Sequence, residues 1–184
     1  MATFRTSQPG SAADSSKPHI ILVGLPGAGK TTVGKIVARL LGRSFLDFDL
    51  EISRREGMTI TEIFAVRGEP VFRQLERSLT EEVALFGNMV LAPGGGWVSQ
   101  ADIVALLRPN ATMVYLFVPP ALALKRMGQK TAGRPLLQRP NPRGELERLL
   151  EVRRVVYESA DHVLSVERLD PQRVAEKVVA LVKT

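Results

Sequence analysis

The stretch FLDFDLE, residues 45–51, places one carboxylate on each side of a single phenylalanine. An apolar run of this kind predicts a buried strand, and side chains two residues apart on a strand point to the same face. We therefore expect Asp47 and Asp49 to share one face where the strand leaves the core. A nearby cation keeps neighbouring carboxylates ionised, so this pair predicts a site for a metal ion or a substrate that needs both charges.

A second stretch, GLPGAGKT at residues 24–31, matches the phosphate-binding pattern G-x-x-x-x-G-K-[ST] at every fixed position. It follows a predicted strand and precedes a predicted helix, which is the context that this motif requires. Backbone N–H groups and the positive end of the helix would surround the phosphates of ATP. In such a loop Lys30 reaches the β- and γ-phosphates and Thr31 binds Mg²⁺, which is the cofactor that we expect.

The carboxylate pair and the phosphate loop fit one reaction, phosphoryl transfer to a hydroxyl group. The second strand of such a sheet ends beside the phosphate site, so both carboxylates would face the nucleotide and the acceptor. One could orient waters of Mg²⁺, and the other could bind the acceptor hydroxyl and take its proton.

Three further features narrow the acceptor to a small anion. Three consecutive glycines at 94–96 follow the third predicted strand and would let a ligand approach the backbone closely. Arg73 and Arg153 lie on two predicted helices, and together they could clamp a carboxylate because the guanidinium fork matches it. Arg134 lies in a basic segment and could close on the transferring phosphoryl group.

The elements that position these residues alternate between strand and helix patterns. Strands are predicted at 19–23, 44–48, 88–92, 112–118 and 162–166. Helices are predicted at 33–41, 59–65 (opened by a Thr59/Glu62 capping box), 72–86, 100–107, 120–127 and 145–159, and a last one is opened by Asp170 and Pro171. This alternation predicts an α/β fold with a parallel sheet, whose ligands bind at the carboxyl ends of the strands.

The length of 184 residues predicts one domain, which we place at residues 18–184. Residues 1–17 are rich in Ser, Ala and Pro, so we expect a disordered N-terminal tail. The segment GQKTAGRPLLQRPNPRG, residues 128–144, fits no regular element. We expect it to form a mobile lid, because its glycines could act as hinges and its basic residues suit a phosphate.

Composition excludes several classes of function. The chain has no cysteine, which rules out disulfides, thiolate metal sites and a cysteine nucleophile. Its net charge is +6, but aromatic residues make up only 5% and do not interleave with the basic run after Lys125, so we expect small anionic ligands and no nucleic-acid partner. No stretch approaches the ~20 apolar residues of a membrane span and the N-terminus has no apolar signal region, so we expect no membrane partner and a cytoplasmic location.

With these residues placed, the chain from Pro18 to its C-terminus resembles the shikimate kinase family, small P-loop kinases of the nucleoside-monophosphate-kinase fold class. Beyond the phosphate loop, the resemblance rests on FLDFD, GMTITEIFAVRGEPVFRQLE, GGG and GRPLL, in that order, and on Arg153 with Tyr157. It implies transfer of the γ-phosphate of ATP to the 3-hydroxyl of shikimate, a step of aromatic amino acid (chorismate) biosynthesis. It also implies a monomer with a three-layer fold, sheet order 2-3-1-4-5 and helices on both faces.

The resemblance also implies a role for each site residue. Asp49 would bind the shikimate hydroxyls and act as base or positioner, while Asp47 would orient the waters of Mg²⁺ beside Thr31. The catalytic residues would be Asp49, Lys30 and Arg134. Shikimate would contact Asp49, Arg73, Gly94, Gly95, Gly96 and Arg153. ATP would contact Gly27, Ala28, Gly29, Lys30, Thr31, Thr32, Arg126, Arg134 and Arg168.

The chain departs from the family pattern at three places. Pro93 stands before the glycines where the family usually has a small residue such as Thr, and Val155 replaces the usual proline before the tyrosine. Met127 competes with Arg126 for the position that stacks on adenine. None of these departures removes a charged catalytic group.

Three kinds of protein remain as alternatives. Another small-molecule kinase, such as a gluconate kinase relative, shares the phosphate loop but would not need both Arg73 and Arg153 beside a glycine trio. A nucleotide kinase would need a pocket for a second base, and the chain shows no aromatic set for one. A non-catalytic nucleotide-binding regulator would not need Lys30, Asp49 and Arg134 together.

Overall fold

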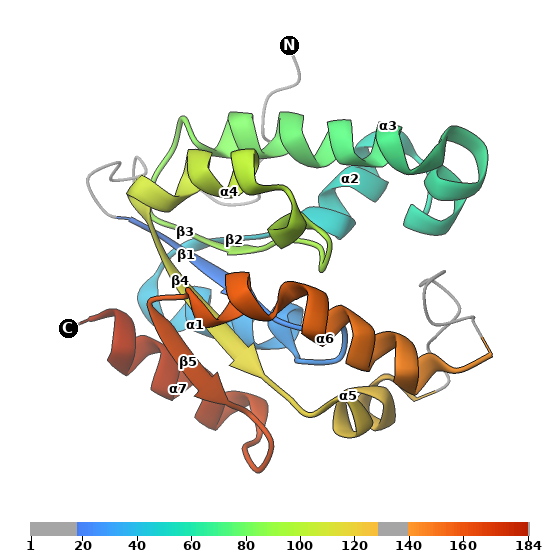
Figure 1. Ribbon diagram of the computed structural model, residues 1–184. Coiled ribbons are helices and arrows are strands. Elements are labelled where there is room, and N and C mark those ends of the chain that lie inside the picture. The colour runs from blue at the N-terminus through green and yellow to red at the C-terminus, as the bar shows by residue number, and fades with distance from the viewer. Residues whose placement is uncertain (1–17, 129–139, 184) are drawn as a thin grey trace.

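The computed structural model of the chain describes residues 18–128 and 140–183 (Figure 1). Its centre is a five-stranded parallel sheet in the order β2-β3-β1-β4-β5, which confirms the predicted α/β fold and strand order. The strands are β1 (His19–Val23), β2 (Ser44–Asp47), β3 (Met89–Ala92), β4 (Ala111–Phe117) and β5 (His162–Ser165).

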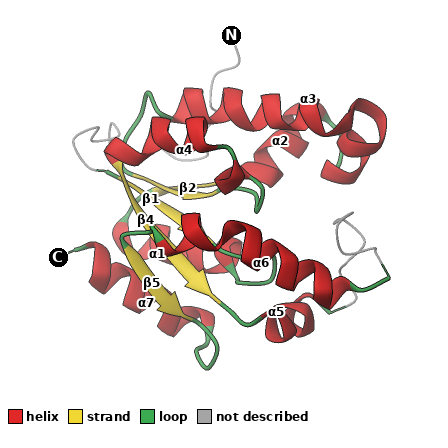
Figure 2. Ribbon diagram, viewed as in Figure 1, coloured by secondary structure: helices red, strands yellow, loops and turns green. Residues whose placement is uncertain are grey.

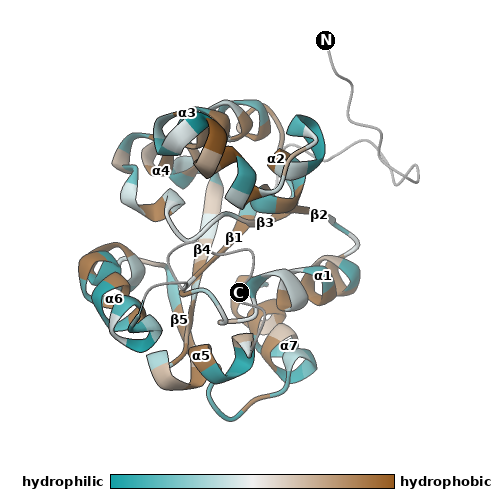
Figure 3. Ribbon diagram, turned by 90° about the vertical axis from the view of Figure 1, so that its right-hand side faces the viewer, coloured by the Kyte–Doolittle hydropathy of each residue, from teal (hydrophilic) through white to brown (hydrophobic). Residues whose placement is uncertain are grey.

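Helices cover both faces of this sheet, as Figure 2 shows, so that the molecule has three layers. They are α1 (Lys30–Leu41), α2 (Phe48–Glu56), α3 (Ile60–Val83), α4 (Ala101–Leu107), α5 (Pro120–Met127), α6 (Pro142–Glu158) and α7 (Pro171–Val182). In Figure 3, α1 and α7 lie on one side of the sheet, and α4 and α6 lie on the other. None of the described helices is both long and apolar enough to cross a membrane.

The burial of the central strand, β1, explains the apolar run in its sequence. All five residues of β1 are buried, and β1 pairs with β3 on one side and β4 on the other. A strand covered on both faces favours apolar side chains at successive positions, which gives the unbroken run IILV in place of an alternating pattern. His19, which precedes this run, is buried as well, and its Nε2 lies at hydrogen-bond distance, 2.9 Å, from the carbonyl oxygen of Phe86. Figure 3 shows the resulting hydrophobic interior between more hydrophilic helix surfaces.

The prediction that Asp47 and Asp49 share the face of one strand is wrong. The strand β2 ends at Asp47, and Asp49 lies in the first turn of α2. Asp47 is the N-cap of this helix, since its Oδ1 accepts a hydrogen bond from the backbone N–H of Leu50 at 3.2 Å. A carboxylate that satisfies a free helix N–H favours helix initiation, so the chain turns before strand alternation can act.

Two helices predicted between β2 and β3 form one element, α3, which is interrupted at Gly68. The capping box is confirmed: Glu62 N donates to Thr59 Oγ1 at 3.2 Å, and Thr59 N donates to Glu62 Oε2 at 2.7 Å. At Gly68 the backbone adopts φ 80° and ψ 167°, which is not helical, and Pro70 follows in the next helical turn. The helix ends at Val83, so Phe86, predicted on its apolar stripe, lies beyond it and is exposed.

Two boundaries near the C-terminus test the cap predictions. The helix α7 begins as predicted, because Asp170 Oδ1 accepts a hydrogen bond from Arg173 N at 2.9 Å. In contrast, α6 begins at Pro142, before the predicted start at residue 145, because Asn141 Oδ1 accepts from Gly144 N at 3.0 Å. The end of the segment predicted as a lid is therefore helical.

Two further predictions fall outside the described residues. One is the tail at 1–17, and the other is the greater part of the predicted lid, residues 129–139, with Arg134.

Candidate active site

The phosphate loop joins β1 to α1 and follows the backbone geometry that its glycines predict. Gly27 and Gly29 have φ values of 84° and 91°, in the left-handed region that L-residues rarely adopt. A Cβ at Gly27 would also lie 2.5 Å from the carbonyl oxygen of Ala123. The N-cap of α1 is Gly29, which supplies no side-chain hydrogen bond, so backbone N–H groups at this helix end can bind a phosphate.

The two polar side chains at the start of α1 contact the phosphate loop and the end of β2. Lys30 Nζ donates hydrogen bonds to the carbonyl oxygens of Gly24 at 2.9 Å and Leu25 at 3.4 Å, so the ammonium lies against its own loop. Thr31 Oγ1 donates to Asp47 Oδ2 at 2.5 Å. A hydroxyl and a carboxylate side by side are the hard oxygen ligands that Mg²⁺ prefers, so these two residues fit the expected ion.

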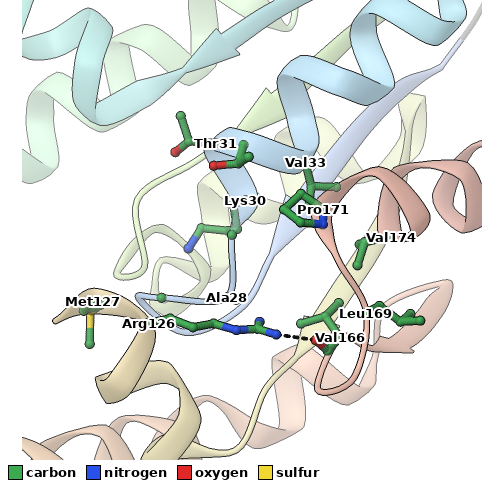
Figure 4. Close-up of a pocket in the computed structure, with 13 residues that line it drawn as sticks. Ala28, Lys30, Thr31, Val33, Arg126, Met127, Val166, Leu169, Pro171 and Val174 are labelled. Carbon is green, nitrogen blue, oxygen red and sulfur yellow. Dashed lines mark hydrogen bonds between the residues drawn. The ribbon is translucent and has the colours of Figure 1, made fainter.

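A cavity of about 520 Å³ lies beside this loop, which is within the usual size of a small-ligand pocket (Figure 4). Arg126 of α5 extends toward the segment after β5, where its Nη2 donates to the carbonyl oxygen of Val166 at 2.6 Å. The lining residues are Gly27, Ala28, Gly29, Lys30, Thr31, Thr32, Val33, Arg126, Met127, Val166, Leu169, Pro171 and Val174.

The cavity brings together most of the residues predicted to contact ATP. Both Arg126 and Met127 line it, so the competition between them for adenine stays open. Arg168 is exposed, and its neighbour Leu169 contributes to the lining in its place. The role of Arg168 therefore stays a prediction.

The glycine trio follows β3 in a tight turn, in which Trp97 N donates to the carbonyl oxygen of Gly94 at 3.0 Å. This turn forms although Pro93, the departure from the family pattern, directly precedes it. A Cβ at Gly95 would lie 3.8 Å from Cδ of Pro26 in the phosphate loop. The turn and the loop are therefore neighbours at the carboxyl ends of the strands.

The side chains that surround this turn leave little room beside its glycines. A Cβ at Gly94 would lie 2.6 Å from Asp49 Oδ1. At Gly95 it would lie 3.1 Å from Nη1 of Arg153, and at Gly96 it would overlap the guanidinium of Arg73. The structure thus brings the three predicted acceptor-binding side chains together on one turn.

Glu76 is a site residue that the sequence analysis missed. It is fully buried on α3, one turn after Arg73, and its Oε1 lies 2.9 Å from the position of a Cβ at Gly94. Its Oε2 accepts hydrogen bonds from Arg73 Nη1 at 2.5 Å and from Gln100 Nε2 at 2.9 Å. The i, i+3 spacing of Arg and Glu in RQLE was the available signal, since such residues are neighbours on a helix.

Burial raises the pKa of Glu76 to about 7, although the positive charge of Arg73 opposes this shift. The negative charge of Asp49 raises the pKa of Glu76 further, in keeping with their shared position at Gly94. Near neutral pH, Glu76 therefore carries a proton for part of the time.

The two arginines of the site differ in their surroundings. Arg73 donates from Nη2 to Glu69 Oε1 at 2.7 Å as well as to Glu76, so its guanidinium is fixed between two carboxylates. Arg153 is only 6% exposed, and among the described residues its Nε has no hydrogen-bond partner. A buried guanidinium is costly without an anion, so the position of Arg153 suits an incoming carboxylate.

Comparison with known proteins agrees with this geometry. The family model described as shikimate kinase matches residues 26–183. A shikimate kinase of Caldicellulosiruptor bescii is 37% identical over 163 residues, which is 89% of this chain and 94% of that protein. The solved structure of a shikimate kinase from Acinetobacter baumannii in complex with shikimate has a TM-score of 0.87 and 40% identity, covering 92% of this chain and 94% of that one.

One of the predicted alternatives shares the architecture alone. A gluconokinase from Sinorhizobium meliloti 1021 has a TM-score of 0.59 but only 16% identity, over 90% of this chain and 91% of that one. Such a likeness shows the common P-loop kinase fold and says nothing about the acceptor. The match to the shikimate kinase model extends from the phosphate loop through the glycine turn and Arg153 to α7, and the chain belongs to the shikimate kinase family.

Proposed function

We propose that this chain transfers the γ-phosphoryl group of ATP to the 3-hydroxyl of shikimate, giving shikimate 3-phosphate and ADP in aromatic amino acid biosynthesis. Membership of the shikimate kinase family supports the activity. The observation that carries the choice of acceptor is the glycine turn, where Asp49, Arg73 and Arg153 surround a backbone that also contacts the phosphate loop at Pro26. This arrangement offers a carboxylate clamp and a proton acceptor next to the phosphates.

Each residue would have a distinct role in the transfer. Arg73 and Arg153 would bind the shikimate carboxylate and fix the ring against the glycine turn. Asp49 would bind the acceptor hydroxyl and accept its proton as the hydroxyl oxygen forms a bond to the γ-phosphorus. The bond from that phosphorus to the bridging oxygen of ADP would break, and ADP would leave with the bridging oxygen.

The phosphate side would bind and polarise ATP. Backbone N–H groups of the loop would surround the phosphates, and Lys30 would turn from its loop carbonyls toward the β- and γ-phosphates. Mg²⁺ bound with ATP would be held by Thr31 and, through water, by Asp47, and it would neutralise charge on the phosphate oxygens. The closing role of Arg134 over the phosphoryl group remains a prediction from sequence, as do a single domain at 18–184, the monomeric state and the cytoplasmic location.

The test is ADP release from Mg²⁺-ATP with a panel of acceptors: shikimate, gluconate, nucleoside monophosphates and water. We expect release with shikimate alone, and phosphorus-31 NMR of the product should place the new ester on the 3-oxygen. ADP release with another acceptor but not with shikimate would support kinase activity and contradict the assignment of shikimate as the acceptor. ATP binding without ADP release for any acceptor would favour the non-catalytic regulator.

A further inference from the structure

The helix α6 carries a second buried side chain on the face that presents Arg153. Tyr157 lies one turn after Arg153 and is fully buried. Its ring stacks on Tyr115 of β4, with 4.7 Å between ring centroids and 13° between ring planes. The stack packs α6 against the sheet, so the position of the Tyr157 hydroxyl is fixed by both elements.

Two polar atoms at this place have no hydrogen-bond partner in the described part of the chain. They are Nε of Arg153 and the hydroxyl oxygen of Tyr157, and both are buried. Buried donors and acceptors are almost always paired, because an unpaired one loses its hydrogen bonds to water without replacement. A pair of such atoms on one helix face needs a functional explanation.

The two groups act on each other electrostatically. Burial raises the pKa of Tyr157, and the positive charge of Arg153 and its closeness as a hydrogen-bond donor lower this pKa. Residues four apart on a helix are neighbours, so a small rotation of the guanidinium would let Arg153 Nε donate to the Tyr157 hydroxyl oxygen. An anion that binds to the Nη atoms of Arg153 would favour such a rotation. One of these atoms, Nη1, lies beside Gly95.

We propose that Tyr157 is a positioning residue for the acceptor: its hydroxyl oxygen accepts a hydrogen bond from Arg153 Nε when the substrate carboxylate occupies the Nη atoms. This inference rests on the proposed role of Arg153. With Nε engaged by Tyr157, the carboxylate must take the Nη1/Nη2 edge, which includes the Nη1 atom beside Gly95. Tyr157 thereby sets the orientation of the bound acceptor and takes no part in proton or phosphoryl transfer.

The first experiment is the substitution Tyr157→Phe, with steady-state kinetics for both substrates. It removes an unpaired hydroxyl and keeps the stacked ring, so we expect an unchanged melting temperature. The KM for shikimate should rise about tenfold, as for the loss of a hydrogen bond to a charged group, while kcat and the KM for ATP stay within about twofold. The matched control is Tyr115→Phe, which removes a hydroxyl from the other ring, whose charged neighbours are Glu158 and Arg154.

A double-mutant cycle separates positioning from packing. Arg153→Lys keeps a positive charge but has no Nε–H, so adding Tyr157→Phe to it should raise the KM for shikimate no further. Equal effects of Tyr157→Phe in both backgrounds would overturn the inference, even if the variant loses some stability.

The outcome also distinguishes this inference from the proposed function. Shikimate turnover that Tyr157→Phe leaves unchanged would overturn the inference alone. Wild-type turnover with a different acceptor and none with shikimate would overturn the proposed function, and the inference with it.

Discussion

The nucleotide side and the acceptor side of the active site are built in different ways. The nucleotide side is formed by one continuous segment, residues 27–33, whose loop backbone would bind the phosphates, and by residues of α5, α7 and the segment after β5. The acceptor side is formed by side chains from α2, α3 and α6 that meet on the turn after β3. These side chains lie far apart in the sequence and include a buried carboxylate, Glu76, that binds Arg73.

This difference determines which substitutions impair binding on each side. Backbone binding depends on glycine conformations, so it is sensitive to an added Cβ. Side-chain binding depends on charges held in partly buried surroundings, so loss of one partner changes both the ligand affinity and the state of the residues that remain. Substitutions on one side should therefore leave the KM for the substrate of the other side largely unchanged.

The largest effect should come from Asp49→Asn, which removes the proposed proton acceptor with little change in size. We expect kcat to fall about 1000-fold with the affinity for ATP within about twofold, because general-base catalysis contributes factors of this order. ADP release and calorimetric titration with a non-hydrolysable ATP analogue measure the two quantities. The control is Asp102→Asn, an exposed aspartate that pairs with Arg77. Normal turnover in Asp49→Asn would remove this residue from the mechanism.

The next largest effect should come from Arg73→Ala. We expect the KM for shikimate to rise about 100-fold, since two charge-assisted hydrogen bonds to the carboxylate are lost, with the KM for ATP nearly constant. Arg77→Ala is the matched control, because Arg77 lies one turn further along α3 and pairs with Asp102 on the surface. A rise confined to the KM for ATP would contradict the carboxylate clamp.

A pair of glycine substitutions tests the comparison directly. Gly96→Ala would push a Cβ into the Arg73 guanidinium, so the KM for shikimate should rise about tenfold. Gly29→Ala would strain a backbone with φ 91° in the phosphate loop, so the KM for ATP should rise by a similar factor. Two variants that both raise the same KM would show that the two sides are not separate.

The smallest effect is on stability and depends on pH. The pKa of Glu76 is raised by burial from about 4.5 to about 7, so on raising the pH the unfolded chain loses this proton before the folded chain does. The free energy of unfolding should therefore fall as the pH rises through this interval. In the wild type we expect the free energy of unfolding to decrease by about 1–3 kcal/mol over this interval. The Glu76→Gln variant should lack this decrease, because its amide cannot ionise.

Urea unfolding of wild type and Glu76→Gln at pH 5 and pH 8 measures this difference. Glu69→Gln is the control, since Glu69 also pairs with Arg73 but is largely exposed. Parallel changes in all three proteins would show that Glu76 does not titrate in this interval.

The local features of the fold were predictable from sequence because their causes are local. The phosphate loop, the Thr59 capping box and the Asp170 cap each follow from residues a few positions apart, and all three are present. The exchange of strand for helix at Asp49 was not predicted, because the cap at Asp47 competes with strand alternation within the same few residues. The merging of two helices across Gly68 depends in the same way on a single backbone angle.

The acceptor site shows the limit of local reasoning. Arg73 and Arg153 were assigned to one carboxylate by the chemistry of guanidinium groups, but only the fold places both at the glycine turn. The glycines there were predicted as points of close ligand approach. The structure gives a further reason for them, since Asp49, Arg153 and Arg73 occupy the space that their Cβ atoms would need.

The sequence by itself determined the phosphate loop, the five strands and the family, since each is encoded in contiguous residues or in a fixed sequence of motifs. Tertiary structure alone decided the burial of Glu76 and the stacking of Tyr157 on Tyr115. The physical reason is that burial and long-range contact depend on how distant segments pack. No local pattern indicates which charged or hydroxyl group will lose its water when those segments meet.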